Sequence, residues 1–259
     1  MDLGIAGRKA IVCASSEGLG KGCAMALAEA GCEVIVNSRT QASVDAAVAE
    51  IADATGACVT GVAADVSTRE GQDAIFEASP QPDILVNNNG GPPRKDFREL
   101  DRDAMIEGVV QNMITPVEFI QRAAPGMAER GFGRIVNITS LSVMMPIEGL
   151  DLSSGARAGL TAFLAGVRPL YAGRNVTINN LLPGKMDTKR LRGGLAAAAN
   201  AANISVEEVT QRQKDEIPAQ RFGNPQEFGN CCAFLCSQHA GYITGQNILM
   251  DGGLFPHAF

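Results

Sequence analysis

Short, continuous apolar runs alternate with longer stretches of helical character along this chain. The apolar runs are typical of strands buried on both faces and fall at residues 8–14, 33–37, 58–64, 84–87, 134–138, 176–181 and 247–250. Helices are predicted between them at residues 19–30, 42–52, 69–78, 101–129, 154–171 and 225–237. Pro116 and Pro125 predict a kink in the longest helix. The alternation predicts an α/β fold, with a doubly wound, mainly parallel sheet of seven strands covered by helices on both faces.

No internal repeat or linker interrupts this alternation, so residues 1–259 are expected to form a single domain. Residues 186–220, between the last two strands, include the Ala/Asn-rich run at 193–203 and are predicted to be a mobile substrate lid. Their basic residues Lys189, Arg190 and Arg192 would suit an anionic or carrier-linked substrate. A solvated lid explains the same charges equally well.

Composition and charge exclude several classes of protein. Hydrophobic residues make up 46% and charged residues 19% of the chain, which is typical of a globular protein. A net charge of −6 argues against nucleic-acid binding. No apolar run reaches membrane length and no signal pattern opens the chain, so we expect a cytoplasmic protein without membrane contact. Seven cysteines without a CxxC pair, and only His239 and His257, predict reduced thiols and no metal site.

A glycine-containing turn follows the first predicted strand. Gly18 and Gly20, with Ser16 and Leu19 beside them, lie where the chain must turn and open a helix. Backbone N–H groups and the helix dipole at such a turn can face a pyrophosphate. Glycine pairs open many helices, but here the pair lies within a strand–helix–strand unit, which favours a dinucleotide site.

The end of the second strand indicates which dinucleotide binds. Ser38 and Arg39 occupy the position of the adenosine ribose, where an acid would hydrogen-bond a 2′-hydroxyl and Arg would attract a 2′-phosphate. NADP(H) is therefore favoured over NAD(H). Glu17 in the glycine turn opposes this, because its carboxylate would repel a 2′-phosphate. The alternative for Arg39 is a solvated residue at a strand end.

Several motifs in order resemble those of the short-chain dehydrogenase/reductase family along nearly the whole chain. The turn at residues 13–20 resembles TGxxxGxG, with Ala14 in place of the first Gly. The other matches are Asp65-Val66, NNNG at 87–90, Asn112 in mid-helix, Ser140 in NITS, Pro183-Gly184 with Thr188, and TGQNILMDGG at 244–253. The GGPP at 90–93 is like that of a divergent subgroup, similar to 3-oxoacyl-carrier-protein reductases, that lacks the Tyr-x-x-x-Lys motif.

The resemblance implies a Rossmann-type fold, a nicotinamide cofactor, and reduction of a carbonyl or oxidation of an alcohol. Residues implied to contact the cofactor are Ser16, Gly18, Leu19, Gly20, Ser38, Arg39, Asp65, Val66, Asn88, Gly90, Arg157, Pro183, Gly184, Met186 and Thr188. The family's helices after the fourth and fifth strands are its usual pairing surface, and residues 154–167 are small and apolar all round. A homo-oligomer, most simply a dihedral tetramer, is expected.

The catalytic pattern departs from the family at its central position. The family places Tyr thirteen residues after the Ser and Lys four further on, and here these positions hold Ser153 and Arg157. The flanking ARAGLTAF keeps the register. Ser153 is a weaker acid than Tyr, and Arg157 keeps the positive charge but exchanges no proton. The Lys-linked role of Asn112, which holds a water in the family, is put in doubt.

Three interpretations stay open. Ser153 relays a proton through water while Arg157 stabilises the alkoxide and Ser140 polarises the carbonyl. Alternatively, Lys185 beside the nicotinamide, or Glu148 or Asp151 before Ser153, replaces the missing Tyr. In the third, redox chemistry is lost, leaving a lyase, an isomerase or a regulatory protein that binds the cofactor. The leading prediction is an NADP(H)-dependent oxidoreductase acting on a small carbonyl or alcohol.

Overall fold

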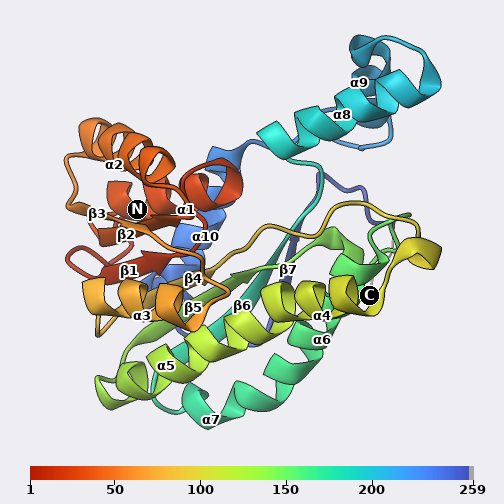
Figure 1. The fold of residues 1–259 in the computed structure, drawn as a ribbon. Coiled ribbons are helices and arrows are strands. Elements are labelled where there is room, and N and C mark those ends of the chain that lie inside the picture. Colours follow the sequence, from red (N-terminus) through yellow and green to blue (C-terminus); the bar gives the residue numbers. More distant parts are fainter. Residues whose placement is uncertain (257–259) are drawn as a thin grey trace.

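Seven strands form one parallel sheet in the order β3-β2-β1-β4-β5-β6-β7 (Figure 1), as the sequence predicted. The computed structural model describes residues 1–256, and His257 lies outside them. The strands are β1 (Lys9–Val12), β2 (Glu33–Ser38), β3 (Val59–Ala63), β4 (Ile84–Asn87), β5 (Gly133–Ile138), β6 (Val176–Pro183) and β7 (Asn247–Met250). The chain starts in the middle of the sheet, runs outward to β3, and then returns to β4 on the other side of β1.

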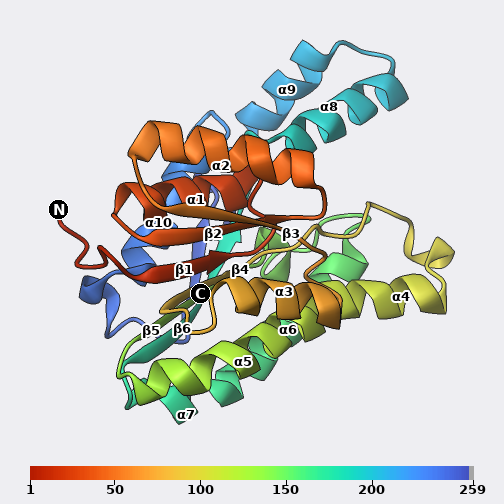
Figure 2. The ribbon, with the colours of Figure 1, turned by 60° about the vertical axis from the view of Figure 1, so that its left-hand side comes forward.

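Helices cover both faces of the sheet (Figure 2). One face carries α1 (Gly18–Glu29), α2 (Gln41–Thr55) and α10 (Pro225–Cys236). The other carries α3 (Arg69–Ala78), α4 (Arg102–Val109), α5 (Thr115–Glu129), α6 (Asp151–Val167) and the short α7 (Pro169–Ala172). Alternate strand residues point to separate cores: Val86 and Val136 pack toward α1 and α10, Leu85 and Ile135 toward α5. Within residues 1–256, none of the helices has the length and hydropathy to span a bilayer.

The predicted long helix at 101–129 is helical throughout, but its irregularity precedes both prolines. Residues Val110–Ile114 form a π-helical turn between α4 and α5, and the Thr115 amide donates to the carbonyl of Val110, five residues back. Pro116 has no N–H to offer the carbonyl of Asn112. The wider turn accommodates that missing bond, and the helix continues through Pro125.

The segment predicted as a lid is a pair of helices, α8 (Lys189–Ala202) and α9 (Val206–Asp215), projecting beyond the sheet (Figures 1 and 2). Asn203, with φ 53°, reverses the chain between them. Leu195, Ala199 and Val209 form a small cluster of buried residues separate from the two main cores. The predicted lid is therefore folded and has packing of its own, while its mobility stays a prediction.

Four asparagines form a row of side-chain hydrogen bonds across the C-terminal half of the sheet. Asn87 donates to Asn137 Oδ1 at 2.9 Å, Asn137 to Asn180 Oδ1 at 3.1 Å, and Asn180 to Asn247 Oδ1 at 2.8 Å. Each pair is also in register in the backbone ladder. We call this row the asparagine ladder; it links β4, β5, β6 and β7 through their side chains.

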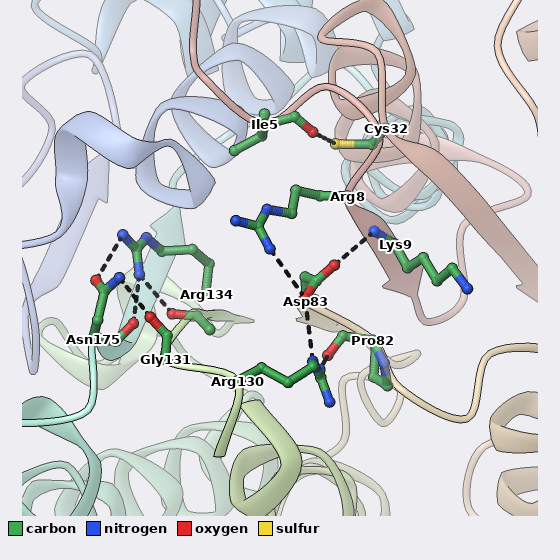
Figure 3. A network of polar contacts seen from close by, with 11 residues as sticks. Ile5, Arg8, Lys9, Cys32, Pro82, Asp83, Arg130, Gly131, Arg134 and Asn175 are labelled. Carbon is green, nitrogen blue, oxygen red and sulfur yellow. Dashed lines mark hydrogen bonds and ion pairs between the residues drawn. The ribbon is translucent and has the colours of Figure 1, made fainter. Parts of the chain in front are cut away.

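A second polar network links residues at the amino ends of the strands, at the edge of the sheet opposite the expected ligand site (Figure 3). Asp83 lies 3.5 Å from Arg8 Nη1 and 3.6 Å from Arg130 Nε. Arg134 is buried, and its guanidinium donates to Ser237 O, to Gly133 O, and to both oxygens of Asn175. Every nitrogen of this buried guanidinium thus has a protein acceptor, which is the usual condition for burying a charge.

Candidate active site

Most predicted site residues follow the carboxyl ends of strands β1 to β6, and Asn112, Ser153 and Arg157 lie on helices. In parallel sheets the ligand crevice forms at this edge, where neighbouring strands send their connections to opposite faces. Here that reversal lies between β1 and β4. The loops that meet there are residues 13–17, 88–96, 139–150 and 184–188.

The glycine turn has the backbone that a pyrophosphate site requires. Gly18 has φ +60°, a conformation that side chains with a Cβ rarely adopt. A Cβ on Gly20 would lie 2.4 Å from the carbonyl oxygen of Ala14, so only glycine fits this close approach. Glu17 precedes α1 without capping it through its side chain, and the helix's first amides are therefore open to an anion, alongside Ser16 and Leu19.

Ala14 holds the left-handed conformation of the glycine that it replaces. Its φ is +44°, which costs an L-residue about 1 kcal/mol. Two asparagines hold it there: Asn37 Oδ1 accepts from the Ala14 amide at 3.2 Å, and Asn88 donates to its carbonyl at 3.0 Å. Asn88 was predicted as a cofactor residue, whereas Asn37 was not, although a buried Asn ending an apolar strand was a signal for it.

The adenosine side of the site brings Arg39 and Asp65 together. Partial burial raises the pKa of the Asp65 carboxyl, but hydrogen bonds from the Ser67 hydroxyl (2.6 Å) and amide (2.9 Å), together with the Arg39 charge, leave that pKa below its usual value. Asp65 is thus an anchored carboxylate beside buried Val66. Arg39 is exposed, and Ser38 pairs with β3 beneath it.

The loop after β6 is held from two sides. Gly184 donates to Met250 O at 2.9 Å, and a Cβ there would lie 2.6 Å from the Asp251 Cβ. Pro183 ends the strand, and Met186 is buried. Thr188 accepts a hydrogen bond from the Leu191 amide and so begins α8.

Lys185 pairs with a carboxylate of the lid segment. Its ammonium lies 2.6 Å from Glu216 Oε2, directly after α9. A lysine held in this ion pair is a poorer proton donor for a carbonyl than a free one. The arrangement disfavours Lys185 as the replacement for the missing Tyr.

Ser140, Ser153 and Arg157 meet where β5 ends and α6 begins. Ser140 caps a 3-10 turn, its Oγ accepting from the Ser142 amide at 3.1 Å. The predicted helix at 154–171 begins earlier, so that Ser153 lies inside the first turn of α6. Arg157 Nε donates to Ser153 Oγ at 3.3 Å, and Nη1 donates to Ile138 O at 2.7 Å, two residues before Ser140.

Arg157 is a buried cation that forms no ion pair within residues 1–256. Only 8% of it is exposed. Burial, and then the charge of Arg190, lower the pKa of Arg157 from the usual arginine value to about 10. A guanidinium with this pKa is still charged near neutral pH, so it brings a full positive charge to the Ser153 hydroxyl.

Asn112 lies in the π-helical turn that packs against α6. Its amide nitrogen donates to Gly108 O at 3.2 Å, but its buried Oδ1 has no hydrogen-bond partner in the described chain. A buried amide oxygen without a partner can accept from a water or a ligand. Position 112 was predicted from sequence, while the π turn that presents it was not.

The three basic residues in the first turn of α8 differ in their partners. Lys189 lies 3.9 Å from Glu17 Oε2, and Arg192 lies 2.8 Å from Asp187 Oδ1. Arg190 instead donates to two carbonyl oxygens of the loop after β4, those of Gly91 and Pro92, at 3.3 and 3.1 Å. Its contact joins the start of α8 to the loop that follows Gly90.

Two hollows flank this region. One, of about 280 Å³, lies between Ser140 and Ser153 in sequence, and residues 142–147, Asp151 and Ser154 line it. The other, of about 430 Å³, is lined by Asp187, Arg192 and residues 221–225 on the outer side of the lid segment. The smaller hollow is lined by Ser142 and Ser154, which are close in sequence to the two serines, and is the better place for a substrate.

Cysteine and acidic side chains form no metal site in residues 1–256: no group of three or more His, Cys, Asp or Glu there could hold an ion. All seven cysteines are free. Burial raises the pKa of Cys13 to about 12, which keeps this thiol beside the glycine turn protonated.

Comparison with known proteins gives matches over the whole chain. A family model described as enoyl-(acyl carrier protein) reductase matches residues 13–255. The 3-oxoacyl-[acyl-carrier-protein] reductase FabG of Aquifex aeolicus is 32% identical over 98% of this chain and 100% of its own length.

Solved structures give the same result. The L-sorbose reductase of Gluconobacter frateurii, complexed with NADPH and L-sorbose, superposes with a TM-score of 0.94 and 27% identity, covering 99% of this chain and 100% of that one. YwfH, an NADPH-dependent reductase involved in bacilysin biosynthesis, gives a TM-score of 0.91 and 28% identity over 97% and 100%.

Proposed function

We propose that this chain, which belongs to the short-chain dehydrogenase/reductase family, is an NADP(H)-dependent oxidoreductase that interconverts a small carbonyl compound and a secondary alcohol. The observation that carries the proposal is the pair of serine hydroxyls, Ser140 and Ser153, whose oxygens each accept a hydrogen bond from a fixed N–H donor. Their own protons are therefore free to be donated to a substrate oxygen.

The chain's residues fit a nicotinamide dinucleotide. Open amides at the start of α1 and the close approach that excludes a Cβ at Gly20 suit a pyrophosphate. A Cβ on Gly90 would meet nothing within 4 Å, which leaves space beside the loop after β4. Thr188 and Gly184 would hold the nicotinamide end, and Asp65 and Val66 the adenine end. When bound, NADP(H) supplies or accepts the hydride.

Arg39 supports NADP(H) over NAD(H). Its exposed guanidinium follows β2, near enough to Asp65 to lower the pKa of that carboxyl, and it can bind a 2′-phosphate. Glu17, the residue that opposes this choice, faces the ammonium of Lys189. L-sorbose reductase carries NADPH in its complex, which agrees with this preference.

Ser140 and Ser153 form the donor pair for the substrate oxygen. During carbonyl reduction both hydroxyls hydrogen-bond the oxygen on which negative charge develops. Arg157, 3.3 Å from Ser153 Oγ, stabilises that charge and favours proton release by Ser153. Ser153 passes its proton to the product oxygen and recovers one from water. Asn112 Oδ1, buried without a partner, can hold such a water.

This mechanism places the chain in the divergent subgroup that works without Tyr-x-x-x-Lys. The substrate enters the hollow of about 280 Å³ beside the two serines. Helices α8 and α9 act as the lid over it.

The test is a steady-state assay of NADPH oxidation by the purified protein with a panel of ketones and aldehydes. Turnover that disappears in Ser140→Ala would support the proposal. A protein that binds NADPH but reduces no carbonyl and oxidises no alcohol would contradict it. A lyase, an isomerase or a cofactor-binding regulator would then be the better account.

A further inference from the structure

Arginines from three separate segments converge on the mouth of the candidate active site. Arg157 lies on α6, Arg190 on the first turn of α8, and Arg94 on the loop after β4. Arg190 contacts this loop at Gly91 and Pro92. The same loop reaches the start of α6, because Lys95 donates to Gly149 O at 3.0 Å and Arg94 Cβ would lie 3.7 Å from a Cβ on Gly149.

These cations have no ion-pair partner within residues 1–256. The basic residues beside them on α8 do: Lys189 is close to Glu17 and Arg192 to Asp187. Arg190 is bound only to neutral carbonyls, and no carboxylate lies within 4 Å of Arg94 or Arg157 in the described chain. Their mutual repulsion is evident in Arg157 and Arg190, whose pKa values are lowered first by burial and then by the neighbouring arginine.

Arg134 shows how this fold satisfies a buried arginine that is purely structural. All three guanidinium nitrogens of Arg134 donate to protein acceptors, and Figure 3 shows those that donate to Asn175. In Arg157, Nε and Nη1 have acceptors, whereas Nη2 has none among the described residues. Nη2 is not among the fully buried side-chain atoms that lack a partner in residues 1–256, so it is accessible and can donate to a ligand that supplies an anion or an acceptor.

We propose that Arg190 and Arg94, with Arg157 behind them, form a subsite for an anionic oxygen group of the substrate, a carboxylate or a phosphate. The subsite rests on the proposed function, since it gives the substrate class of the same active site. Arg190 presents its two terminal nitrogens side by side to two carbonyl oxygens, the geometry in which a guanidinium binds a carboxylate. The anion would replace those carbonyls, and the lid would be drawn over the substrate only when the substrate carries the charge.

Acidic groups near the subsite restrict where an anion can bind. Asp151 lines the neighbouring hollow from the first turn of α6, and Glu148 precedes it. Asp151 lies at a helix N-terminus, where the dipole stabilises its charge. Asp151 would repel an anion inside the hollow, so the anionic group is expected at the arginines, with the neutral part of the substrate toward Asp151.

The experiment compares two matched pairs of probes by calorimetry on the full chain, with and without NADP⁺. The pairs are acetoacetate with methyl acetoacetate, and dihydroxyacetone phosphate with dihydroxyacetone. The wild-type protein should bind the anion of at least one pair about tenfold or more tightly than its neutral partner. Whichever pair shows this preference identifies the anion as carboxylate or phosphate. Equal binding within both pairs, or binding of neither anion, would overturn the subsite.

Variants assign the preference to residues. Arg190→Gln and Arg94→Gln should each reduce anion binding about tenfold or more and leave the neutral probe unaffected, with Arg190→Lys intermediate. Arg192→Gln, two residues along the same helix and already paired with Asp187, is the matched control and should change neither. NADPH affinity should stay within about twofold of wild type; a tenfold loss would assign the arginines to the cofactor instead.

The two proposals fail differently. If Arg190→Gln loses acetoacetate binding but the wild-type protein reduces no carbonyl, the anion subsite is supported and the oxidoreductase function is contradicted. If wild type and Arg190→Gln both reduce carbonyls, with equal kcat/KM for the two members of each pair, the function is supported and the subsite is contradicted.

Discussion

Arg157 donates a 3.3 Å hydrogen bond from Nε to the Ser153 hydroxyl, which lies one turn earlier on α6. The donor is fixed by a second bond, from Nη1 to Ile138 O. Because a guanidinium can only donate, Ser153 Oγ must accept, and its proton points elsewhere. A Ser–Arg pair therefore reproduces part of what a Tyr–Lys pair does: a hydroxyl oriented toward the substrate, with a cation behind it.

Removing either hydroxyl or the cation should reduce turnover. Ser140→Ala is expected to raise the barrier by a few kcal/mol, about 10²-fold or more in kcat, because one donor to the developing alkoxide is lost. Arg157→Ala should reduce kcat and also weaken NADPH binding, whereas Ser140→Ala should leave NADPH affinity unchanged. Steady-state kinetics and calorimetry measure the two effects. Wild-type kcat in both variants would rule out the assigned roles.

Restoring the family pattern is the converse test. Ser153→Tyr combined with Arg157→Lys should increase carbonyl reduction, because the backbone of α6 keeps the register of the motif. Either substitution alone should not, since the Tyr needs the Lys ammonium to lower its pKa. A double variant that folds, binds NADPH and is less active than wild type would show that the hydride geometry itself differs.

The pKa of Arg157 predicts the alkaline limit of activity. Burial, followed by Arg190, lowers it to about 10, so its charge is complete at neutral pH and is lost as pH rises through about 10. kcat/KM should fall above that pH. In Arg157→Lys the alkaline fall in kcat/KM should occur at lower pH. A lysine has a lower reference pKa than an arginine, and burial at this position would lower the pKa of the ammonium further. A fall at unchanged pH would show that another group controls it.

The lowered pKa of Arg157 affects stability in the opposite direction: activity should fall at high pH, whereas the folded state gains stability. Above about pH 10, and below the usual pKa of an arginine, the unfolded chain holds the Arg157 proton and the folded chain does not. The unfolded state then binds more protons, so this group makes the folded state more stable as pH rises through that window.

Cofactor choice is predicted from Arg39. NADPH should bind more tightly than NADH by about 1–3 kcal/mol, and Arg39→Ala should remove most of this difference without weakening NADH. Glu17→Gln should strengthen NADPH binding. Calorimetry measures these affinities, with Arg212→Ala as a control on the distant α9. Equal wild-type affinities would contradict the assignment of Arg39 to the 2′-phosphate.

Assembly is predicted from exposed apolar side chains on the α4–α6 face. Met105, Ile106, Ile114 and Phe163 are each 42–50% exposed. Covering them in a homotetramer would remove this surface from water. Light scattering should give a tetramer at micromolar concentration, and Phe163→Glu should dissociate it. A wild-type monomer would contradict the expectation.

Much of the fold could be predicted because apolar runs such as Val34–Val36 and Leu85–Val86 encode a sheet buried on both faces. The glycine turn was also readable, since Gly18 and Gly20 are required by a positive φ and a close approach that local sequence expresses directly. The boundary of α6 was placed three residues late, because Asp151 and Leu152 begin the helix without a side-chain cap.

Contacts between distant segments could not be predicted in this way. The bonds from Arg190 to Gly91 and Pro92 join segments about a hundred residues apart, with nothing in either segment to specify the other. Asn37 supports Ala14 only because β1 and β2 are neighbours.

The asparagine ladder should contribute measurably to stability. Asn137→Ala removes the bond that Asn137 accepts from Asn87 and the bond that it donates to Asn180. Asn180 is buried and its Oδ1 would have no donor, whereas Asn87 would keep its bond to Pro116 O, so the loss should be about 1–3 kcal/mol. Urea unfolding measures the loss, and Asn200→Ala, exposed on α8, is the control that should change stability by less than about 0.5 kcal/mol. A loss of that small size at Asn137 would contradict the role of the ladder.

The ladder also distinguishes correct from incorrect strand alignment. Side chains alternate between the two faces of a sheet, so sliding one strand by a single residue would turn its asparagine from one core into the other. An apolar residue in such a slipped strand finds another apolar core, at little penalty. An asparagine amide has no hydrogen-bond partner in that core, and the asparagine on the neighbouring strand loses its partner as well. The four asparagines thus mark one alignment of β4 to β7 as the native one, and with it the alignment that brings Ser140, Pro183 and the lid to the same edge of the sheet.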